Sequence, residues 1–254
     1  LIVVGEWMSI TIFKNDYGQF TAPETIAQSN GWWTRIKADD LDGDGDMDFV
    51  VGNWGTNSKF QASSSSPLSL FVKDFDGNGK SEPILNWKAP LDKKQFPFAS
   101  KRELTDQLPL LKKNNNSYKE FVALDYESLF DIKQKEGALQ YTCNTLETGV
   151  LWNDNGKLTF SALPIQAQFS PIFGISIADF DKDGKKDIWL GGNFYNLKPQ
   201  VGRLDANKGL LLKGLGNKKF NAISNEMSGI KVKGEVRDAV FINGKLIVAR
   251  NNDT

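Results

Sequence analysis

A short acidic pattern recurs along the chain and constrains its fold more than any other feature of the sequence. Each copy fits D-x-D-x-[DN]-G-x-x-[DE], and the copies occupy residues 40–48, 74–82 and 179–187. Carboxylates this close repel one another, because two unit charges about 4 Å apart cost about 4 kcal/mol at an effective dielectric constant of about 20. We therefore expect each loop to hold something that offsets the repulsion.

The spacing predicts a cation site in each loop. Oxygens at the first, third and fifth positions converge when the backbone curls tightly, the glycine at the sixth position permits the turn, the seventh offers a carbonyl and the ninth closes the shell. A donor set made only of oxygen favours calcium, since magnesium usually keeps several waters. The predicted ligands are Asp40, Asp42, Asp44, Asp46 and Asp48 in the first loop, Asp74, Asp76, Asn78, Lys80 and Glu82 in the second, and Asp179, Asp181, Asp183, Lys185 and Asp187 in the third, with Asp46, Lys80 and Lys185 contributing backbone carbonyls.

Two alternatives to this interpretation can be weighed from the residues. Any single loop could be a solvated Asp/Gly turn, but repetition in matching register favours metal binding. An EF-hand needs Glu at the twelfth position, where this chain has Val51, Leu85 and Leu190. The loops are also followed by β-rich runs such as "DFVVGNW" and "DIWLGGNF". Each loop is therefore predicted to join two strands. The second loop is the least regular, because Asn78 and Glu82 replace aspartates there.

A second pattern alternates with the acidic loops. Residues 10–20, 150–160 and 210–220 each read as an apolar strand, an Asn/Gly turn and a strand that ends in Phe, which is typical of a hairpin. Their final residues, Phe20, Phe160 and Phe220, are expected to pack in the core. Near the end, "VRDAVFINGKLIVARNN" has the same shape around a tight Asn243-Gly244 turn. The order strand, acidic loop, strand, hairpin predicts the blades of a β-propeller.

These residues resemble the FG-GAP/VCBS repeat of integrin α-subunit propellers and of many bacterial surface proteins. The likeness is carried by the first acidic loop with "FVVGN" after it, by "FKNDYGQF", and by "NWGTNSKF…PLSLFVKDFDGNG", which is similar to VCBS-repeat proteins of the Bacteroidetes type. It covers most of the chain outside about 88–140. The resemblance implies an all-β, calcium-stabilised β-propeller with four-stranded blades that acts outside the cytoplasm. Because 254 residues are few for a whole propeller, we expect a fragment or a part of one.

Residues 88–140 interrupt the repeat. "SKRELTDQLPLLKKN" and "ALDYESLFDIKQK" have apolar residues at helical spacing, and Ser100 with Glu103 fits a capping box. We predict a partly helical insertion at 88–140 within a single FG-GAP/VCBS-type propeller domain spanning 1–254. Such an insertion could carry function or could cover a strand edge.

Composition excludes several classes of function. The chain has no histidine and one cysteine, which rules out His-based catalysis, His-ligated zinc and an internal disulfide within it. Cys143 is expected to be a small buried hydrophobe. The net charge is zero, so nucleic acid is not expected as a partner, and no apolar run approaches the length of a bilayer span. The tryptophans are expected to pack in the core more than to form a glycan platform.

Together these features predict a non-catalytic, calcium-stabilised propeller that binds a protein or glycan, in adhesion or capture at a bacterial cell surface or outside the cell. Extracellular calcium modules bind at about 10⁻⁴ to 10⁻³ M, so cytosolic sites would stay largely empty and an extracytoplasmic location follows, whether periplasmic, outer-surface or secreted. No signal segment is present in the chain, which begins as if within a strand. The alternative is the propeller domain of a lyase-like carbohydrate-active enzyme that uses Asp, Glu, Lys or Tyr as acid and base.

Overall fold

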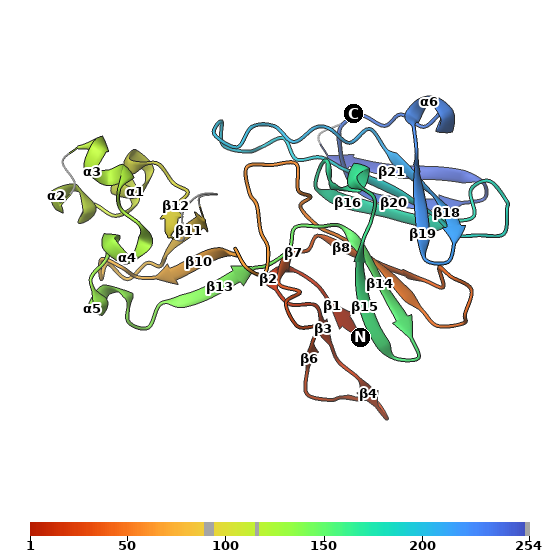
Figure 1. The fold of residues 1–254 in the computed structure, drawn as a ribbon, viewed down its shortest axis with the longest axis horizontal. Helices are drawn as coiled ribbons and strands as arrows, with labels where there is room; N and C mark the ends of the chain where they lie inside the picture. Colours follow the sequence, from red (N-terminus) through yellow and green to blue (C-terminus); the bar gives the residue numbers. More distant parts are fainter. Residues whose placement is uncertain (89–93, 115–116, 252–254) are drawn as a thin grey trace. The chain divides into compact units, whose positions relative to one another are not determined.

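The structure, a computed structural model, describes residues 1–88, 94–114 and 117–251. Its described part is dominated by antiparallel sheets, three of which have four strands, and this confirms the predicted all-β, propeller-like fold. The chain forms two compact units (Figure 1). We call residues 1–27, 31–59 and 146–254 the blade unit, and residues 28–30 and 60–145 the helical unit.

The first blade of the blade unit is a sheet of order β15-β14-β9-β8. Its acidic loop joins β8 to β9, and a tight hairpin joins β14 to β15, so the predicted sequence of strand, loop, strand and hairpin is confirmed. Between β9 and β14 the chain passes through the helical unit, yet the two strands pair directly, with Val50 opposite Val150. The strands are β8 (Arg35–Asp39), β9 (Asp48–Gly52), β14 (Gly149–Asp154) and β15 (Lys157–Ala162).

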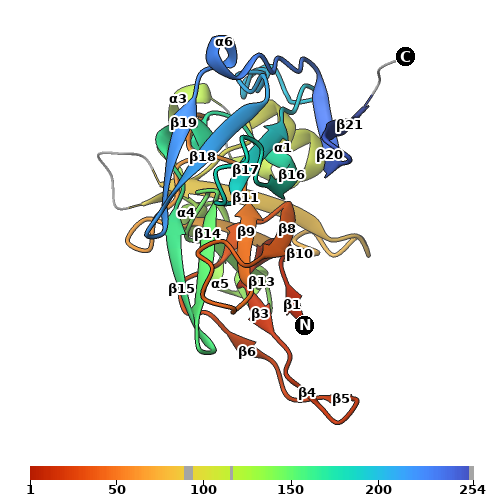
Figure 2. The same cartoon turned by 90° about the vertical axis from the view of Figure 1, so that its right-hand side faces the viewer.

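The second blade repeats this design without an interruption. Its sheet has the order β16-β17-β18-β19, and the third acidic loop joins its first two strands. Strand β16 lies beside β8 and β9 of the first blade on one side and beside β20 on the other (Figure 2). The strands are β16 (Ile172–Ala178), β17 (Asp187–Gly192), β18 (Leu210–Gly216) and β19 (Lys219–Ile223).

A further hairpin of β20 (Glu235–Ile242) and β21 (Lys245–Asn251) follows the short helix α6 (Asn225–Ser228). Its turn has positive φ at both Asn243 (51°) and Gly244 (72°). This is the tight hairpin turn that the Asn-Gly pair predicts, because its twist matches that of the flanking strands.

The N-terminal residues form short strands. A three-stranded sheet contains β1 (Ile2–Val3), β3 (Thr11–Ile12) and β6 (Glu24–Thr25), while β2 (Glu6–Met8) pairs with β7 (Gly31–Trp32). The predicted hairpin at 10–20 has only two-residue strands at its tip, β4 (Asn15–Asp16) and β5 (Gln19–Phe20). The prediction that Phe20 packs in the core is therefore wrong: its side chain is 58% exposed, and its ring lies edge-to-face with that of Phe13.

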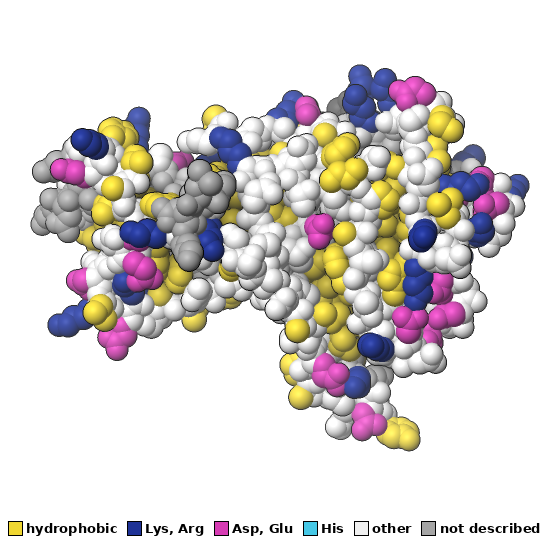
Figure 3. Space-filling model, viewed as in Figure 1, with side chains coloured by type: hydrophobic (Ala, Val, Ile, Leu, Met, Phe, Trp, Pro, Cys, Tyr) yellow, Lys and Arg dark blue, Asp and Glu magenta, His cyan; other side chains and the backbone are white. Residues whose placement is uncertain are grey.

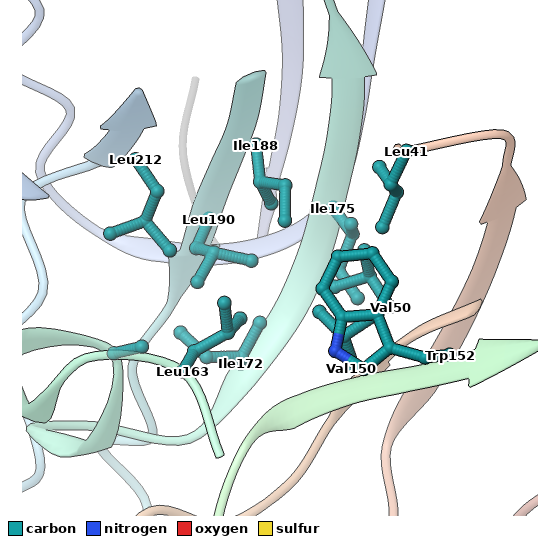
Figure 4. Close-up of a cluster of buried hydrophobic side chains, with 11 residues drawn as sticks. Leu41, Val50, Val150, Trp152, Leu163, Ile172, Ile175, Ile188, Leu190 and Leu212 are labelled. Carbon is teal, nitrogen blue, oxygen red and sulfur yellow. The ribbon is translucent and has the colours of Figure 1, made fainter. Parts of the chain in front are cut away.

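The main core of the blade unit lies between its two blades (Figure 4). Both sheets contribute aliphatic side chains from their facing sides, which removes apolar surface from water. Phe160 and Phe220 pack against the cores as predicted. Tryptophan packing is confirmed too, since Trp33, Trp152 and Trp189 are buried. The buried cluster comprises Leu41, Val50, Val150, Trp152, Leu163, Ala167, Ile172, Ile175, Ile188, Leu190 and Leu212.

The helical unit has its own sheet, of order β12-β11-β10-β13, and its own core. The second acidic loop joins β10 (Leu68–Lys73) to β11 (Glu82–Lys88), so it belongs to this sheet and to neither blade. The other strands are β12 (Gln95–Pro97) and β13 (Leu139–Cys143), and Cys143 is buried as expected. The helices are α1 (Lys101–Gln107), α2 (Leu111–Asn114), α3 (Tyr118–Val122), α4 (Tyr126–Leu129) and α5 (Ile132–Lys135).

The capping box of Ser100 and Glu103 starts α1, as the sequence predicts. Residues 89–93 and 115–116 of the predicted insertion lie outside the described residues. That 88–140 is an insertion within a single propeller domain stays a prediction. The topology adds that the described residues within 60–145 form one compact unit together with residues 28–30. In sequence, residues 60–145 lie between two paired strands of the first blade, β9 and β14.

Candidate metal centres

The three acidic loops share one pattern of backbone hydrogen bonds. The first carboxylate accepts from the sixth-position glycine, the third-position carboxylate accepts from the fifth-position N–H, and the fifth side chain accepts from the seventh N–H. The glycine N–H to carboxylate distances are 3.1 Å for Gly45 to Asp40, 2.8 Å for Gly79 to Asp74 and 2.9 Å for Gly184 to Asp179. The seventh-position distances are 2.8 Å for Asp46 to Asp44, 2.8 Å for Lys80 to Asn78 and 3.0 Å for Lys185 to Asp183.

The backbone of each loop curls through positive φ at two positions. At the sixth position the residue is always glycine, with φ of 96°, 87° and 86° at Gly45, Gly79 and Gly184. The fourth position also has positive φ, and there the third loop has Lys182, at 64°, in place of glycine. A side chain in this region is strained by contact with its own backbone. The acidic pattern in the sequence predicts glycine at the sixth position only.

The ninth-position acid is buried and clamps its loop. Asp48 accepts from Leu41 N–H at 3.0 Å, and Asp187 accepts from Phe180 N–H at 2.9 Å. In both blades the second carboxylate oxygen accepts from the neighbouring strand. Asp48 Oδ1 accepts from Asn153 N–H of β14 at 2.9 Å, and Asp187 Oδ1 accepts from Gly214 N–H of β18 at 2.8 Å. One carboxylate thus links the acidic loop, its own strand and the neighbouring strand in each blade.

The electrostatics of the loops follow from burial and from these bonds. Burial raises the pKa of Asp48 and of Asp187 above the usual aspartate value, and neighbouring aspartates of the loop add to that effect. Hydrogen bonds from backbone N–H groups lower the pKa of Asp74 and Asp183, with Lys213 contributing at Asp183. A bound cation would favour the ionised form of the two buried carboxylates.

The structure brings together the carboxylates of the first, third and ninth positions. One oxygen from each lies within 4.8 Å of the others in all three loops, and among the described residues no histidine or cysteine belongs to these groups. An all-oxygen set of this kind fits a hard divalent cation. The groups are Asp40, Asp42 and Asp48; Asp74, Asp76 and Glu82; and Asp179, Asp181 and Asp187.

The fifth and seventh positions are placed differently. Asp44 approaches Asp42 and Asp154 and is not grouped with the ninth position, while Asn78 and Asp183 form turns within their loops. That these residues bind the ion, and that Asp46, Lys80 and Lys185 offer their carbonyls, stays a prediction.

Sequence reasoning missed three charged residues beside the loops. Asp154, in the hairpin of the first blade, approaches Asp42 and Asp44. Lys218 contacts Asp154 and lies 3.5 Å from Asp42, and Lys213 contacts Asp181 and lies 3.1 Å from Asp183. No local spacing could reveal these contacts. Aligning the 150–160 and 210–220 hairpins with the acidic loops of their blades offered the only signal.

A buried asparagine at the opposite end of the second strand was missed as well. Asn53 accepts from Trp54 N–H at 2.8 Å, and Asn193 donates to the carbonyls of Asn207 and Gly234 at 2.8 and 2.9 Å. Both are almost fully buried. The repeated Gly-Asn-aromatic ending of "VVGNW" and "LGGNF" was the available signal. Each blade is thus fastened at one end by an acid and at the other by an amide.

Comparison with known proteins gives one match. Residues 1–51 fit the family model for the FG-GAP-like repeat, and no curated protein matches the chain. The matched segment runs from β1 through the first acidic loop into β9. The narrower likeness to Bacteroidetes-type VCBS-repeat proteins stays a prediction. Among the described residues, no helix combines the length and apolar character needed to cross a bilayer. The chain therefore carries an FG-GAP-like repeat, as its acidic loop and the strand after it predict, within an all-β, propeller-like fold.

Proposed function

We propose that the chain is a non-catalytic, calcium-binding β-propeller module whose ions stabilise the blades that present a binding surface for a glycan or protein. The observation that supports this proposal is the repeated loop geometry, in which the same hydrogen bonds gather oxygen atoms in three separate loops. Turns that were only solvated would not need a buried acid at the ninth position of every copy.

In this proposal the ion of the first loop is held by the side chains of Asp40, Asp42, Asp44 and Asp48 and by the carbonyl of Asp46. Asp74, Asp76, Asn78, Lys80 and Glu82 would serve the second loop, and Asp179, Asp181, Asp183, Lys185 and Asp187 the third. Calcium supplies positive charge where buried carboxylates have raised pKa values. The residues of the chain do the rest, since the ninth-position acid transmits the order of the loop to the neighbouring strands.

The location follows from the strength of such sites. Extracellular calcium modules bind at about 10⁻⁴ to 10⁻³ M, so the loops would be filled outside the cytoplasm and largely empty in the cytosol. We therefore place the module at a bacterial cell surface, in the periplasm or in a secreted protein.

A catalytic role has one observation in its favour. A cavity of about 350 Å³ in the blade unit is lined by carboxylates together with Trp152 and Phe220. Those carboxylates already have partners, since Asp39 pairs with Lys186 at 3.1 Å and Asp40 and Asp42 belong to the first loop. The carboxylates of this cavity are thus committed to an ion pair and to the first loop, which favours the non-catalytic proposal over the lyase-like alternative.

The proposal is tested by adding calcium or terbium to protein treated with chelator. Trp152 lines the same cavity as Asp40 and Asp42, so terbium in the first loop should luminesce when tryptophan is excited. We expect this signal to fall in Asp42→Ala, in which the other two loops still bind terbium, and to stay at its full value in Asp16→Ala, which changes an exposed acid of β4. An unchanged melting temperature in excess chelator, with no terbium signal, would contradict the proposal.

A further inference from the structure

A second cavity of the blade unit has cationic walls. It measures about 360 Å³, and its charged lining consists of Arg203, Lys208, Lys233 and Arg250 with a single acid, Asp205. The lining therefore carries three more positive than negative side chains, in a chain whose net charge is zero. Basic side chains gather on the surface beside α6 (Figure 3).

This cavity lies far from the acidic loops. Strand β17 begins at Asp187, the ninth position of the third loop, and ends at Gly192, next to Asn193, which lines the cavity. At about 3.3 Å per residue, the strand separates the two sites by about 20 Å. A bound calcium ion would therefore not neutralise the cations of the cavity or serve as their partner.

Two buried asparagines that line the cavity are held by hydrogen bonds. Asn193 and Asn207 are 2% and 7% exposed. The amide group of Asn193 donates to the carbonyls of Asn207 and Gly234, and its oxygen accepts from Asn207 N–H at 3.0 Å. These bonds join Asn193 to the segment that carries Arg203 and Lys208 and to the segment that carries Lys233, so the backbone behind these three cations is held in place before any ligand arrives.

Arg203 presents its charge to solvent. The guanidinium of Arg203 stacks on the ring of Tyr195 at 3.5 Å and lies 3.4 Å from Asp205, with both charged side chains more than half exposed. Arg250 donates to the carbonyl of Lys233 at 3.0 Å. The nearby Glu235 is buried and accepts from Arg237 and from Tyr195 N–H.

We propose that this cavity binds an acidic oligosaccharide through its carboxylate or sulfate groups. The preference for an anion rests on the cavity alone, because guanidinium and ammonium groups recognise oxyanions with charge-assisted hydrogen bonds. The saccharide rests on the function proposed above, and the volume of the cavity is that of a small-molecule site. Nucleic acid is disfavoured, since the cations occupy one hollow and do not form a stripe along the surface.

The first test compares four probes in calcium buffer by titration calorimetry. Galacturonate and sulfated tetrasaccharides should bind, with affinity that falls steeply as salt rises. Cellotetraose, which is neutral, should bind at least tenfold more weakly. Tetraglutamate should also bind more weakly than the acidic sugars. Equal binding of the neutral sugar, tighter binding of the peptide, or inorganic sulfate competing at the same concentration as the sulfated sugar would each overturn the inference.

The second test uses matched lysine variants. Lys233→Gln should weaken binding of the acidic sugars about fivefold, and Lys208→Gln with Lys233→Gln about twentyfold, the effect of removing exposed ionic contacts. Lys245→Gln, at the other end of β21, should change it less than about twofold. Circular dichroism and calcium-dependent melting confirm that each variant folds. Equal effects of Lys233→Gln and Lys245→Gln would overturn the inference.

The two proposals can fail separately. If calcium stabilises the protein but acidic sugars do not bind, the metal-stabilised module is supported and the anion-binding cavity is refuted. If acidic sugars bind but the melting temperature is unchanged in chelator, the anion-binding cavity is supported and the structural ions are refuted.

Discussion

The acidic loops of the blades and the acidic loop of the helical unit share their local geometry but differ in what they hold together. In both blades the ninth-position aspartate bonds its own loop and a third strand. In the helical unit Glu82 accepts from Phe75 N–H at 3.0 Å, and within the part of the chain that the structure describes it bonds no further strand. In each blade the ninth-position acid therefore links its loop to a neighbouring strand as well. In the helical unit the corresponding acid bonds its own loop.

This difference shows that the acidic motif determines the conformation of its own turn but not how many neighbouring strands its ninth residue bonds. In each blade the strand that follows the acidic loop is paired with the first strand of a hairpin. One N–H group of this hairpin strand donates to the ninth-position acid. In the helical unit β11 is paired with the short strand β12. The contribution of the ninth-position acid to the stability of its sheet thus depends on the neighbouring strand and not on the acidic pattern.

Removing calcium with a chelator should give the largest difference in stability between the two units. A ligand at about 100 times its dissociation constant stabilises the folded state by about 2.7 kcal/mol, and the blade unit has two acidic loops while the helical unit has one. We expect calorimetry with and without chelator to show a larger drop in melting temperature for the blade unit. The helical-unit transition is identified with Leu104→Ala, which opens its core. Equal shifts in both transitions would break the comparison.

Replacing the ninth-position acid should give the next largest effect, measured without calcium by urea unfolding. Asp187→Asn places an amide against two N–H donors, of which only one can be satisfied, so we expect a loss of about 2–3 kcal/mol. Glu82→Gln has one such donor to satisfy and should cost about 1 kcal/mol or less. Asp16→Asn serves as the exposed control. Equal losses for Asp187→Asn and Glu82→Gln would contradict the link to the neighbouring strand.

Lowering the pH should destabilise the helical unit through Asp125, which lies outside the three acidic loops. Asp125 caps α4, and hydrogen bonds from Ser128, with Lys94 3.3 Å away, lower its pKa. Because the folded-state pKa lies below the unfolded value of about 3.9, the stabilisation is present above that pH and is lost as the pH falls through the folded-state pKa. Asp125→Ala should lose about 1 kcal/mol at pH 7, and unfolding from pH 7 to pH 2.5 should show this gap narrowing. A constant gap would contradict the assignment.

The smallest effect concerns the fourth position of the loops. Lys182 has φ of 64°, while Gly43 and Gly77 have 81° and 74° in the corresponding places. Lys182→Gly should therefore stabilise the protein by up to about 1 kcal/mol, and Gly77→Ala should destabilise it by about as much. Both are measured by urea unfolding in chelator. A loss of stability in Lys182→Gly would show that the lysine side chain makes a compensating contact.

Much of the fold was predictable from the sequence because its signals are local. The acidic turns, the strands around them and the Asn243-Gly244 turn each follow from a few neighbouring residues. The pairing of Val50 with Val150 was not predictable, since the apolar pattern of β9 does not say which distant strand lies beside it. The exposure of Phe20 follows from the shortness of its hairpin, which hydrophobic alternation does not reveal.

The candidate site divides in the same way. Asp40, Asp42 and Asp48 come together because one tight turn brings them together. Asp154 and Lys218 reach that turn from other strands, and their presence depends on packing between and within blades. The cationic cavity has no motif at all, because Arg203, Lys233 and Arg250 come from separate segments.

The pairing of β9 with β14 across the helical unit has a consequence for biosynthesis. During translation β9 emerges well before β14, and until Gly149 leaves the ribosome one edge of β9 has no partner. An open edge of this kind invites pairing with other chains. Folding of residues 60–145 in the interval would bring the two ends of the gap together, so that the late strand closes a short loop and not a long one.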